Sequence, residues 1–172
     1  MKRLFLLRHA KAAPAEPGQE DFDRPLMLSG AEDAGAMARH LRKSGYAMEL
    51  VLSSSSARTT QTAELVLKEL PAEIEYRDAL YLAPPAKLLA AVRAAPVTVS
   101  SLMLVGHNPG LEELAALLAR EPVRRKERAR RDVLDEKFPT CALAILDFDC
   151  PRWRDVAQGH GKLVDFVRPK DL

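Results

Sequence analysis

The chain has 172 residues, 47% of them hydrophobic and 29% charged, which is typical of one globular domain rather than of a disordered chain. Its formal net charge of +2 and its 5% aromatic content do not favour nucleic-acid binding, which draws on basic surfaces and stacked aromatic side chains. We therefore expect a single domain over residues 1–172 and no nucleic-acid partner.

Neither a metal site, a disulfide framework nor a membrane segment is predicted. Cys141 and Cys150 lack the spacing of a zinc site, and two cysteines are too few for a disulfide framework. The longest apolar runs fall far short of the roughly 20 residues of a membrane helix. Arg8 and His9 end the N-terminal apolar stretch too early for a signal peptide. We expect a cytoplasmic protein with reduced thiols and with no metal, cofactor or membrane partner.

The first half of the chain alternates between apolar runs and helical patterns. Residues 4–7 are uniformly apolar, which predicts a strand buried on both faces. After a polar loop, Ser29 is the expected N-cap of a helix, with Glu32 as its capping-box partner and Gly45 as its end. Residues 50–52 predict a second buried strand. The polar run 53–56 then leads into a helix that stops before Pro71.

The second half continues this alternation and then changes. Strands are predicted at residues 74–76 and 102–105, and helices at 87–95 and 109–120, the last with Pro109 in its first turn. Three more strands are expected late in the chain, at residues 141–148, 153–156 and 163–167. Alternating strands and helices predict an α/β fold, a three-layer α/β/α sandwich around a mostly parallel central sheet.

Histidine and arginine side chains follow three of the predicted strands. Arg8 and His9 come after the first strand, Arg58 after the second, and His107 after the fourth. Ligands of open parallel sheets bind beyond the carboxyl ends of the strands, so we expect these side chains to converge. Guanidinium groups suit phosphate oxygens, and the helix N-terminus that follows His107 favours an anion. The pattern predicts phosphoryl transfer.

Three motifs resemble the histidine phosphatase superfamily, whose members share a phosphoglycerate mutase-like fold. They are Leu7-Arg8-His9-Ala10, the run from Ser53 through Arg58 to Ala63, and Val105-Gly106-His107-Asn108. The short chain and the segment Asp23-Arg24-Pro25-Leu26 leading to Ser29-Gly30 resemble more narrowly the SixA-type phosphohistidine phosphatases. The resemblance implies a metal-independent phosphatase that uses no cofactor.

The resemblance implies a role for each motif residue. His9 would be the nucleophile that accepts the phosphoryl group, which requires a neutral imidazole. Arg8 and Arg58 would hold the phosphoryl oxygens, and as neighbouring cations they would disfavour protonation of His9. His107 would donate a hydrogen bond to the transferring group.

Two further residues are predicted to bind the substrate. Asn108 would do so through its backbone N–H, beside His107. Arg24 matches an active-site arginine of the SixA-like proteins. Because it lies in a polar loop, exposure to solvent or pairing with Asp23 is the alternative.

A missing carboxylate bears on the substrate. Many phosphatases of the superfamily carry a glutamate that protonates the leaving oxygen, and Leu82 stands near that position here. An alkoxide needs such an acid, whereas an imidazole can leave with the proton it already carries. This predicts phosphohistidine in a protein as the substrate. The alternatives are a small phosphorylated substrate, with Asp78 or Glu75 as the acid, and a phosphate-binding module with little turnover.

Residues 120–132 form a basic segment with seven basic and three acidic side chains, inside an insertion at about residues 120–138. A solvated loop or helix face is the simpler interpretation. The alternative is a surface that flanks the pocket and attracts an acidic phosphoprotein.

Overall fold

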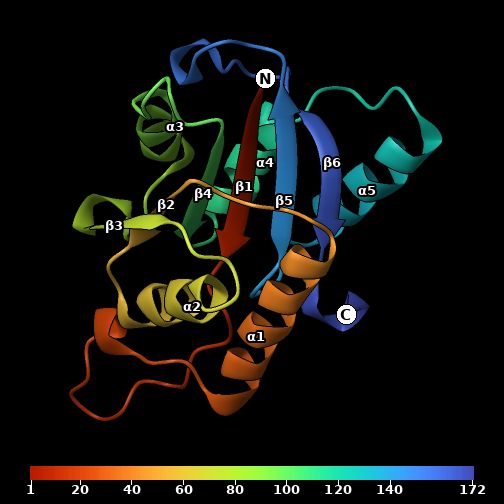
Figure 1. The fold of residues 1–172 in the computed structure, drawn as a ribbon. Helices are drawn as coiled ribbons and strands as arrows, with labels where there is room; N and C mark the ends of the chain where they lie inside the picture. Colours follow the sequence, from red (N-terminus) through yellow and green to blue (C-terminus); the bar gives the residue numbers. More distant parts are fainter.

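The computed structural model describes all residues from 1 to 172 and places six strands in one sheet of order β3-β2-β4-β1-β5-β6 (Figure 1). The strands are β1 (Lys2–Arg8), β2 (Leu50–Ser54), β3 (Glu73–Arg77), β4 (Ser101–Gly106), β5 (Leu143–Phe148) and β6 (Lys162–Val167). The pairs among β1 to β4 are parallel, and β5 is antiparallel to both of its neighbours. The predicted, mostly parallel sheet is confirmed.

Five α-helices cover the two faces of this sheet: α1 (Leu28–Lys43), α2 (Ala57–Leu67), α3 (Pro85–Arg93), α4 (Gly110–Leu118) and α5 (Arg125–Glu136). Alternate side chains of β1 separate the layers. Phe5 and Leu7 pack in one core cluster with α1 and α2, while Leu4 and Leu6 pack in the other with α3, α4 and α5. The fold is therefore the predicted α/β/α sandwich, and Figure 1 shows α1 and α2 together on one face.

The start of α1 differs from the prediction. The helix begins at Leu28, its N-cap is Met27, and no side chain caps it, so the predicted capping box of Ser29 and Glu32 is wrong. The Met27 N–H instead donates to the Lys11 carbonyl at 3.0 Å, next to a β-bridge between Ala12 and Leu26. A contact between two distant segments, rather than a local cap, determines where this helix starts.

The predicted strand at residues 153–156 is also wrong. Trp153–Asp155 forms a single 3₁₀ turn, and β6 is the strand that pairs with β5. The Trp153 side chain is buried, and its indole N–H donates to the Val99 carbonyl at 2.7 Å. Burying a large side chain and satisfying its only donor outweighs the strand preference of this aromatic residue.

Residues 125–132 of the basic segment lie in α5, which packs beside β6 at the edge of the sheet (Figure 1). Arg120 pairs with the buried carboxylate of Glu127 at 2.9 Å, and Arg131 pairs with Asp135 at 2.9 Å. Part of the segment's positive charge is thus neutralised by ion pairs within the protein. No helix in the structure is long and apolar enough to cross a membrane.

Candidate active site

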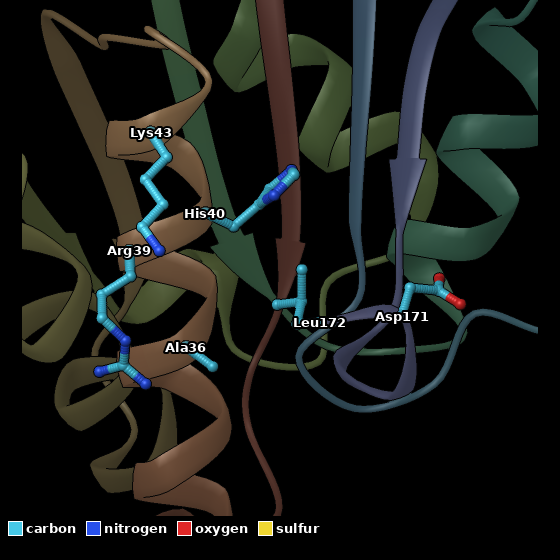
Figure 2. Close-up of a pocket in the computed structure, with 6 residues that line it drawn as sticks. All are labelled: Ala36, Arg39, His40, Lys43, Asp171 and Leu172. Atoms are coloured by element: carbon cyan, nitrogen blue, oxygen red, sulfur yellow. The ribbon is translucent and has the colours of Figure 1, made fainter.

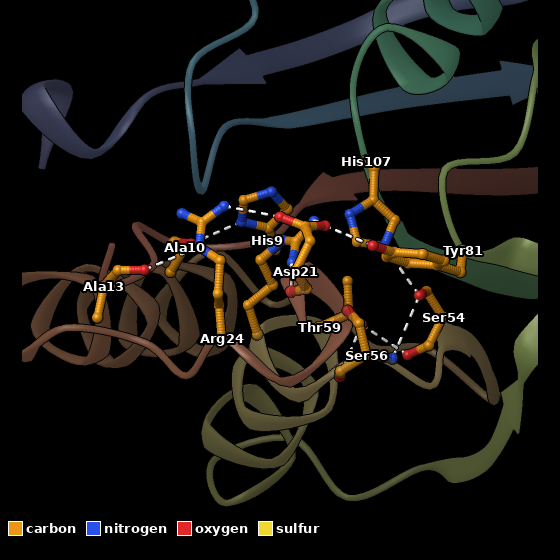
Figure 3. A network of polar contacts seen from close by, with 11 residues as sticks. His9, Ala10, Ala13, Asp21, Arg24, Ser54, Ser56, Thr59, Tyr81 and His107 are labelled. Carbon is orange, nitrogen blue, oxygen red and sulfur yellow. Dashed lines mark hydrogen bonds and ion pairs between the residues drawn. The ribbon is translucent and has the colours of Figure 1, made fainter. Parts of the chain in front are cut away.

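The carboxyl ends of three neighbouring strands bring the predicted side chains together, and Figure 3 shows His9 and His107 among them. His9 directly follows β1 and His107 directly follows β4, and the two strands pair so that Arg8 lies opposite Gly106. The imidazole centroids of His9 and His107 are 5.3 Å apart. Arg58 lies in the first turn of α2, just after β2. The predicted convergence of two histidines and two arginines is confirmed.

The ring of His9 is held in one orientation and one tautomer. Its Nδ1 lies 2.7 Å from the carbonyl oxygen of Ala10, which can only accept, so Nδ1 carries the proton and Nε2 keeps its lone pair. Burial, followed by the charges of Arg58, Arg8 and Arg24, lowers the pKa of His9 to about 4. The arginine effect is as predicted, but burial is the larger cause. His9 is a neutral base near pH 7.

Two buried polar nitrogens near His9 have no partner within the protein. The Nε2 of His107 lies 2.8 Å from the hydroxyl of Ser54, whereas its Nδ1 is buried and unpaired. Arg8 donates from Nη1 to the Phe138 carbonyl at 3.1 Å, but its Nε is also buried and unpaired. Unpaired buried polar atoms are rare in folded proteins, and they mark a place for a polar ligand. Burial lowers the pKa of His107 to about 3, so this ring is neutral as well.

Asp21 links the two remaining arginines. Its carboxylate accepts from Arg24 at 2.8 Å and from Arg58 at 3.0 Å, and it also accepts from the Tyr81 hydroxyl (Figure 3). For Arg24, pairing with Asp23 is the alternative to a role in substrate binding, and the structure pairs Arg24 with Asp21 instead. The Tyr81 hydroxyl and the two guanidinium groups hold the pKa of Asp21 well below its usual range. An ionised carboxylate therefore lies among the cations of the site.

Known proteins resemble this chain in sequence and in structure. Residues 4–81 match the model of the histidine phosphatase superfamily, branch 1. A protein of Agrobacterium tumefaciens assigned as the phosphohistidine phosphatase SixA is 36% identical, with 98% of each chain covered and a TM-score of 0.80. The chain belongs to the histidine phosphatase superfamily. A protein of Nakamurella multipartitia with the same assignment is 32% identical, with a TM-score of 0.82 over 98% of this chain and 96% of that one.

A third solved structure, the protein histidine phosphatase SixA complexed with tungstate, is 25% identical and has a TM-score of 0.72 over 98% of each chain. The structural matches extend over nearly the whole chain, and a protein of Mycobacterium tuberculosis is 34% identical over 95% of this chain and 100% of its own length. The protein is thus SixA-like in sequence and in fold, with a phosphoglycerate mutase-like α/β architecture. It is a phosphatase.

The side chain of Asn108 is engaged within the protein. Its side-chain amide donates to the Phe138 carbonyl at 2.8 Å, the same carbonyl that accepts from Arg8. The side chain therefore braces the segment after α5 against the site. A substrate contact from the backbone N–H of Asn108 stays a prediction.

The two carboxylates considered as acids are engaged elsewhere. Asp78 accepts a hydrogen bond from the Ser55 hydroxyl, and Glu75 pairs with Arg77 at 2.5 Å. Leu82 is 53% exposed to solvent at the position where the superfamily's glutamate was sought. Neither Asp78 nor Glu75 contacts a histidine or arginine of the predicted site.

Asp21 and Tyr81 shape the histidine phosphatase site, and the sequence alone did not identify either of them. Thr62 shapes it as well. Thr62 accepts from the Ala10 N–H at 3.0 Å and donates to the Arg58 carbonyl at 2.7 Å, which links the end of β1 to the first turn of α2. The spacing of Asp21 three positions before Arg24 was an available signal, but nothing local indicates Tyr81.

A separate surface pocket of about 460 Å³ lies between α1 and the C-terminal turn (Figure 2). Its lining includes Arg39, Lys43 and Asp171, and none of the predicted site residues contributes to it. The structure places no three histidine, cysteine, aspartate or glutamate side chains together as a metal site. Both cysteines are free, and burial raises the pKa of Cys141 to about 12.

Proposed function

We propose that this protein removes phosphoryl groups from phosphohistidine side chains of a partner protein, through a phosphoryl intermediate on His9. The observation that carries the proposal is the pair of buried nitrogens without partners, Arg8 Nε and His107 Nδ1, near a neutral His9. A phosphoryl group on His9 would accept a hydrogen bond from Arg8 Nε, and one from His107 Nδ1 when the Ser54 hydroxyl donates to His107 Nε2. The tungstate bound to a SixA relative is an oxyanion of similar shape and charge.

In the first step, the lone pair of His9 Nε2 attacks phosphorus, and the bond from phosphorus to the substrate nitrogen breaks. The electron pair of that bond stays on the substrate imidazole, whose other ring nitrogen carries a proton, so the ring departs neutral. The equatorial oxygens gather negative charge that cations must offset. Arg8, Arg24 and Arg58 supply three such cations, which is why we propose a metal-independent reaction.

In the second step, a water oxygen attacks phosphorus on phospho-His9, and the electron pair of the P–N bond returns to Nε2. One proton of the water remains with the phosphate product, which leaves as hydrogen phosphate, and the other is released to the solvent. Because Nδ1 keeps its proton against the Ala10 carbonyl, His9 also departs as a neutral imidazole. Both steps therefore expel the same kind of leaving group, so a site able to perform the second step has the chemistry for phosphohistidine in the first.

The state of Asp21 supports a P–N substrate over an alkyl phosphate. Among the carboxylates, Asp21 is the one that contacts the site arginines, and its lowered pKa keeps it ionised at neutral pH. An ionised carboxylate has no proton to give to an alkoxide. The small-molecule phosphomonoesterase alternative would require a different acid, such as Asp78.

A pulse with a labelled phosphoryl donor tests the intermediate. The wild type is incubated briefly with ³²P-labelled phosphohistidine protein and quenched in base, where a phosphoryl group on histidine survives. We expect base-stable, acid-labile label on the chain, and no label on the His9→Ala variant. Asn108→Ala is the matched control, since it alters a neighbouring brace and leaves the nucleophile in place.

The substrate class is tested by comparing phosphohistidine protein with a panel of alkyl phosphates. We expect kcat/KM at least tenfold higher for the P–N substrate. Faster hydrolysis of an alkyl phosphate would favour the phosphomonoesterase, and stoichiometric binding without label or hydrolysis would leave only a phosphate-binding module.

A further inference from the structure

Two of the few aromatic side chains lie together at the site. The ring centroid of Tyr81 is 5.3 Å from that of His107 at an interplanar angle of 86°. Phe22 meets Tyr81 edge to face, with centroids 5.0 Å apart, and the guanidinium carbon of Arg58 lies 5.8 Å from the Tyr81 centroid. Figure 3 shows Tyr81 directly beside His107. We call Phe22 and Tyr81 the aromatic wall.

The wall comes from two loops that the fold holds firmly. Leu82, the neighbour of Tyr81, has a φ of 49°, a left-handed conformation that costs a non-glycine residue roughly 1–2 kcal/mol. Such strain persists where the surroundings impose it, and it gathers at functional sites. The carbonyl of Ala83 lies so close to Gly110 that a Cβ there would clash with it. The short segment that carries Tyr81 therefore runs from β3 to a close contact with the start of α4.

The other half of the wall is anchored through its neighbour. Phe22 lies in the 3₁₀ turn Asp21–Asp23, and the carbonyl and carboxylate of Asp21 both accept from Arg58. The Tyr81 hydroxyl donates to the same carboxylate. Both aromatic rings are partly exposed, so each offers surface to a ligand. An anion bound by the arginines would bring its substituent next to these rings.

We propose that the aromatic wall recognises the planar ring of the leaving group, so that the enzyme selects a phosphoryl group carried by an imidazole over one on a non-aromatic nitrogen. Aromatic rings attract one another edge to face or offset at centroid distances of 4.5–7 Å, the geometry the wall already uses with His107. The inference rests on the proposed function, because it concerns the group that leaves in the first step.

Two P–N compounds test the wall. N-phosphoimidazole and phosphoramidate both donate a phosphoryl group from a P–N bond, but only the first has a ring. The measured quantity is the ratio of their kcat/KM values, compared between each variant and the wild type, which cancels their intrinsic reactivities. We expect Tyr81→Leu and Phe22→Leu to lower the ratio about tenfold, whatever their effect on phosphoramidate alone.

Two controls separate the ring from other effects. Tyr81→Phe keeps the ring and loses only the hydrogen bond to Asp21, so its ratio should stay within about twofold of wild type. Tyr76→Leu removes an exposed tyrosine from β3 outside the site, and it should leave the ratio unchanged.

Each outcome decides one point. If both leucine variants keep the wild-type ratio of kcat/KM values, the aromatic wall does not recognise the ring. The phosphohistidine mechanism would remain intact. Turnover of neither P–N compound by the wild type, with hydrolysis of alkyl phosphates, would instead reject the proposed function. Phosphoramidate hydrolysis also reports that a variant is folded, and if Tyr81→Leu does not fold, Phe22→Leu carries the test.

Discussion

The surroundings of His9 decide its chemistry at the scale of the residue. An ordinary histidine has a pKa of about 6.5 and is partly protonated at neutral pH. Here the pKa is lowered to about 4 by burial and by three arginines, while the Ala10 carbonyl fixes the proton on Nδ1. The same arginines that would bind a phosphoryl group thus keep the proposed nucleophile free of a proton.

We expect ¹⁵N NMR of the free protein to show His9 as the Nδ1–H tautomer with a titration midpoint near pH 4. In a urea concentration that unfolds the chain, the midpoint should return to about 6.5. The unfolded state therefore takes up the proton first as the pH falls. The stability due to neutral His9 is present above about pH 6.5 and is lost as the pH falls toward 4. A midpoint near 6.5 in the folded protein would contradict this account.

At the scale of the element, the first turn of α1 lies against the segment that follows His9. A Cβ on Gly30 would clash with the carbonyl of Lys11, so this helix can approach only because residue 30 has no side chain. The contact holds the chain just after Ala10, whose carbonyl orients the His9 ring. Gly30 takes no part in the chemistry, but it supports the geometry of the site.

We expect Gly30→Ala to lower the free energy of unfolding by about 1–3 kcal/mol and kcat/KM at least tenfold, because the backbone at Lys11 must move. Gly35→Ala, in the same helix, is the matched control. Its Cβ would meet only the flexible Arg39 side chain at 3.4 Å, so helix propensity should stabilise the protein by about 0.5–1 kcal/mol. Urea unfolding and aryl phosphate hydrolysis measure both; equal behaviour of the two variants would refute the explanation.

At the scale of the whole molecule, charge is distributed unevenly. The exposed cations of the basic segment that lie outside its ion pairs gather at the start of α5: Arg124, Arg125, Lys126 and Arg128. The helix has 12 residues, so its first turn lies about 18 Å from the end that leads to Phe138 and the site. These cations are placed to meet a large acidic partner rather than a small substrate.

We expect the triple charge reversal Arg124→Glu, Arg125→Glu and Arg128→Glu to lower kcat/KM for a phosphoprotein about tenfold at low salt, because electrostatic attraction speeds association. Hydrolysis of a small aryl phosphate should stay within about twofold of wild type. The difference should shrink at high salt, where charges are screened.

The control for this prediction is the reversal of three exposed cations elsewhere, Arg39→Glu, Lys43→Glu and Lys68→Glu, which changes the net charge equally. If both triple variants lose the same activity, total charge rather than the segment matters. Equal losses on the phosphoprotein and on the aryl phosphate would show that α5 plays no part in attracting a protein.

Much of the fold and of the site was predictable because the relevant signals are local. Apolar runs such as residues 4–7 and 102–105 are buried strands, and the polar residues that follow them must gather at one edge of a parallel sheet. Where a local signal competed with a tertiary contact, the contact prevailed. The Met27 hydrogen bond to Lys11 replaced the cap at Ser29, and the burial of Trp153 replaced a strand.

The sequence by itself determined the layered α/β fold, the family resemblance and the meeting of Arg8, His9, Arg58 and His107, because order along the chain and periodicity specify strand ends. Only the tertiary structure decided that Asp21 bridges the arginines and that Tyr81 stands beside His107. Asp21 and Tyr81 are 60 positions apart. Their contact, like the burial that lowers the pKa of His9, depends on how separate loops pack, and no pattern of neighbouring residues encodes it.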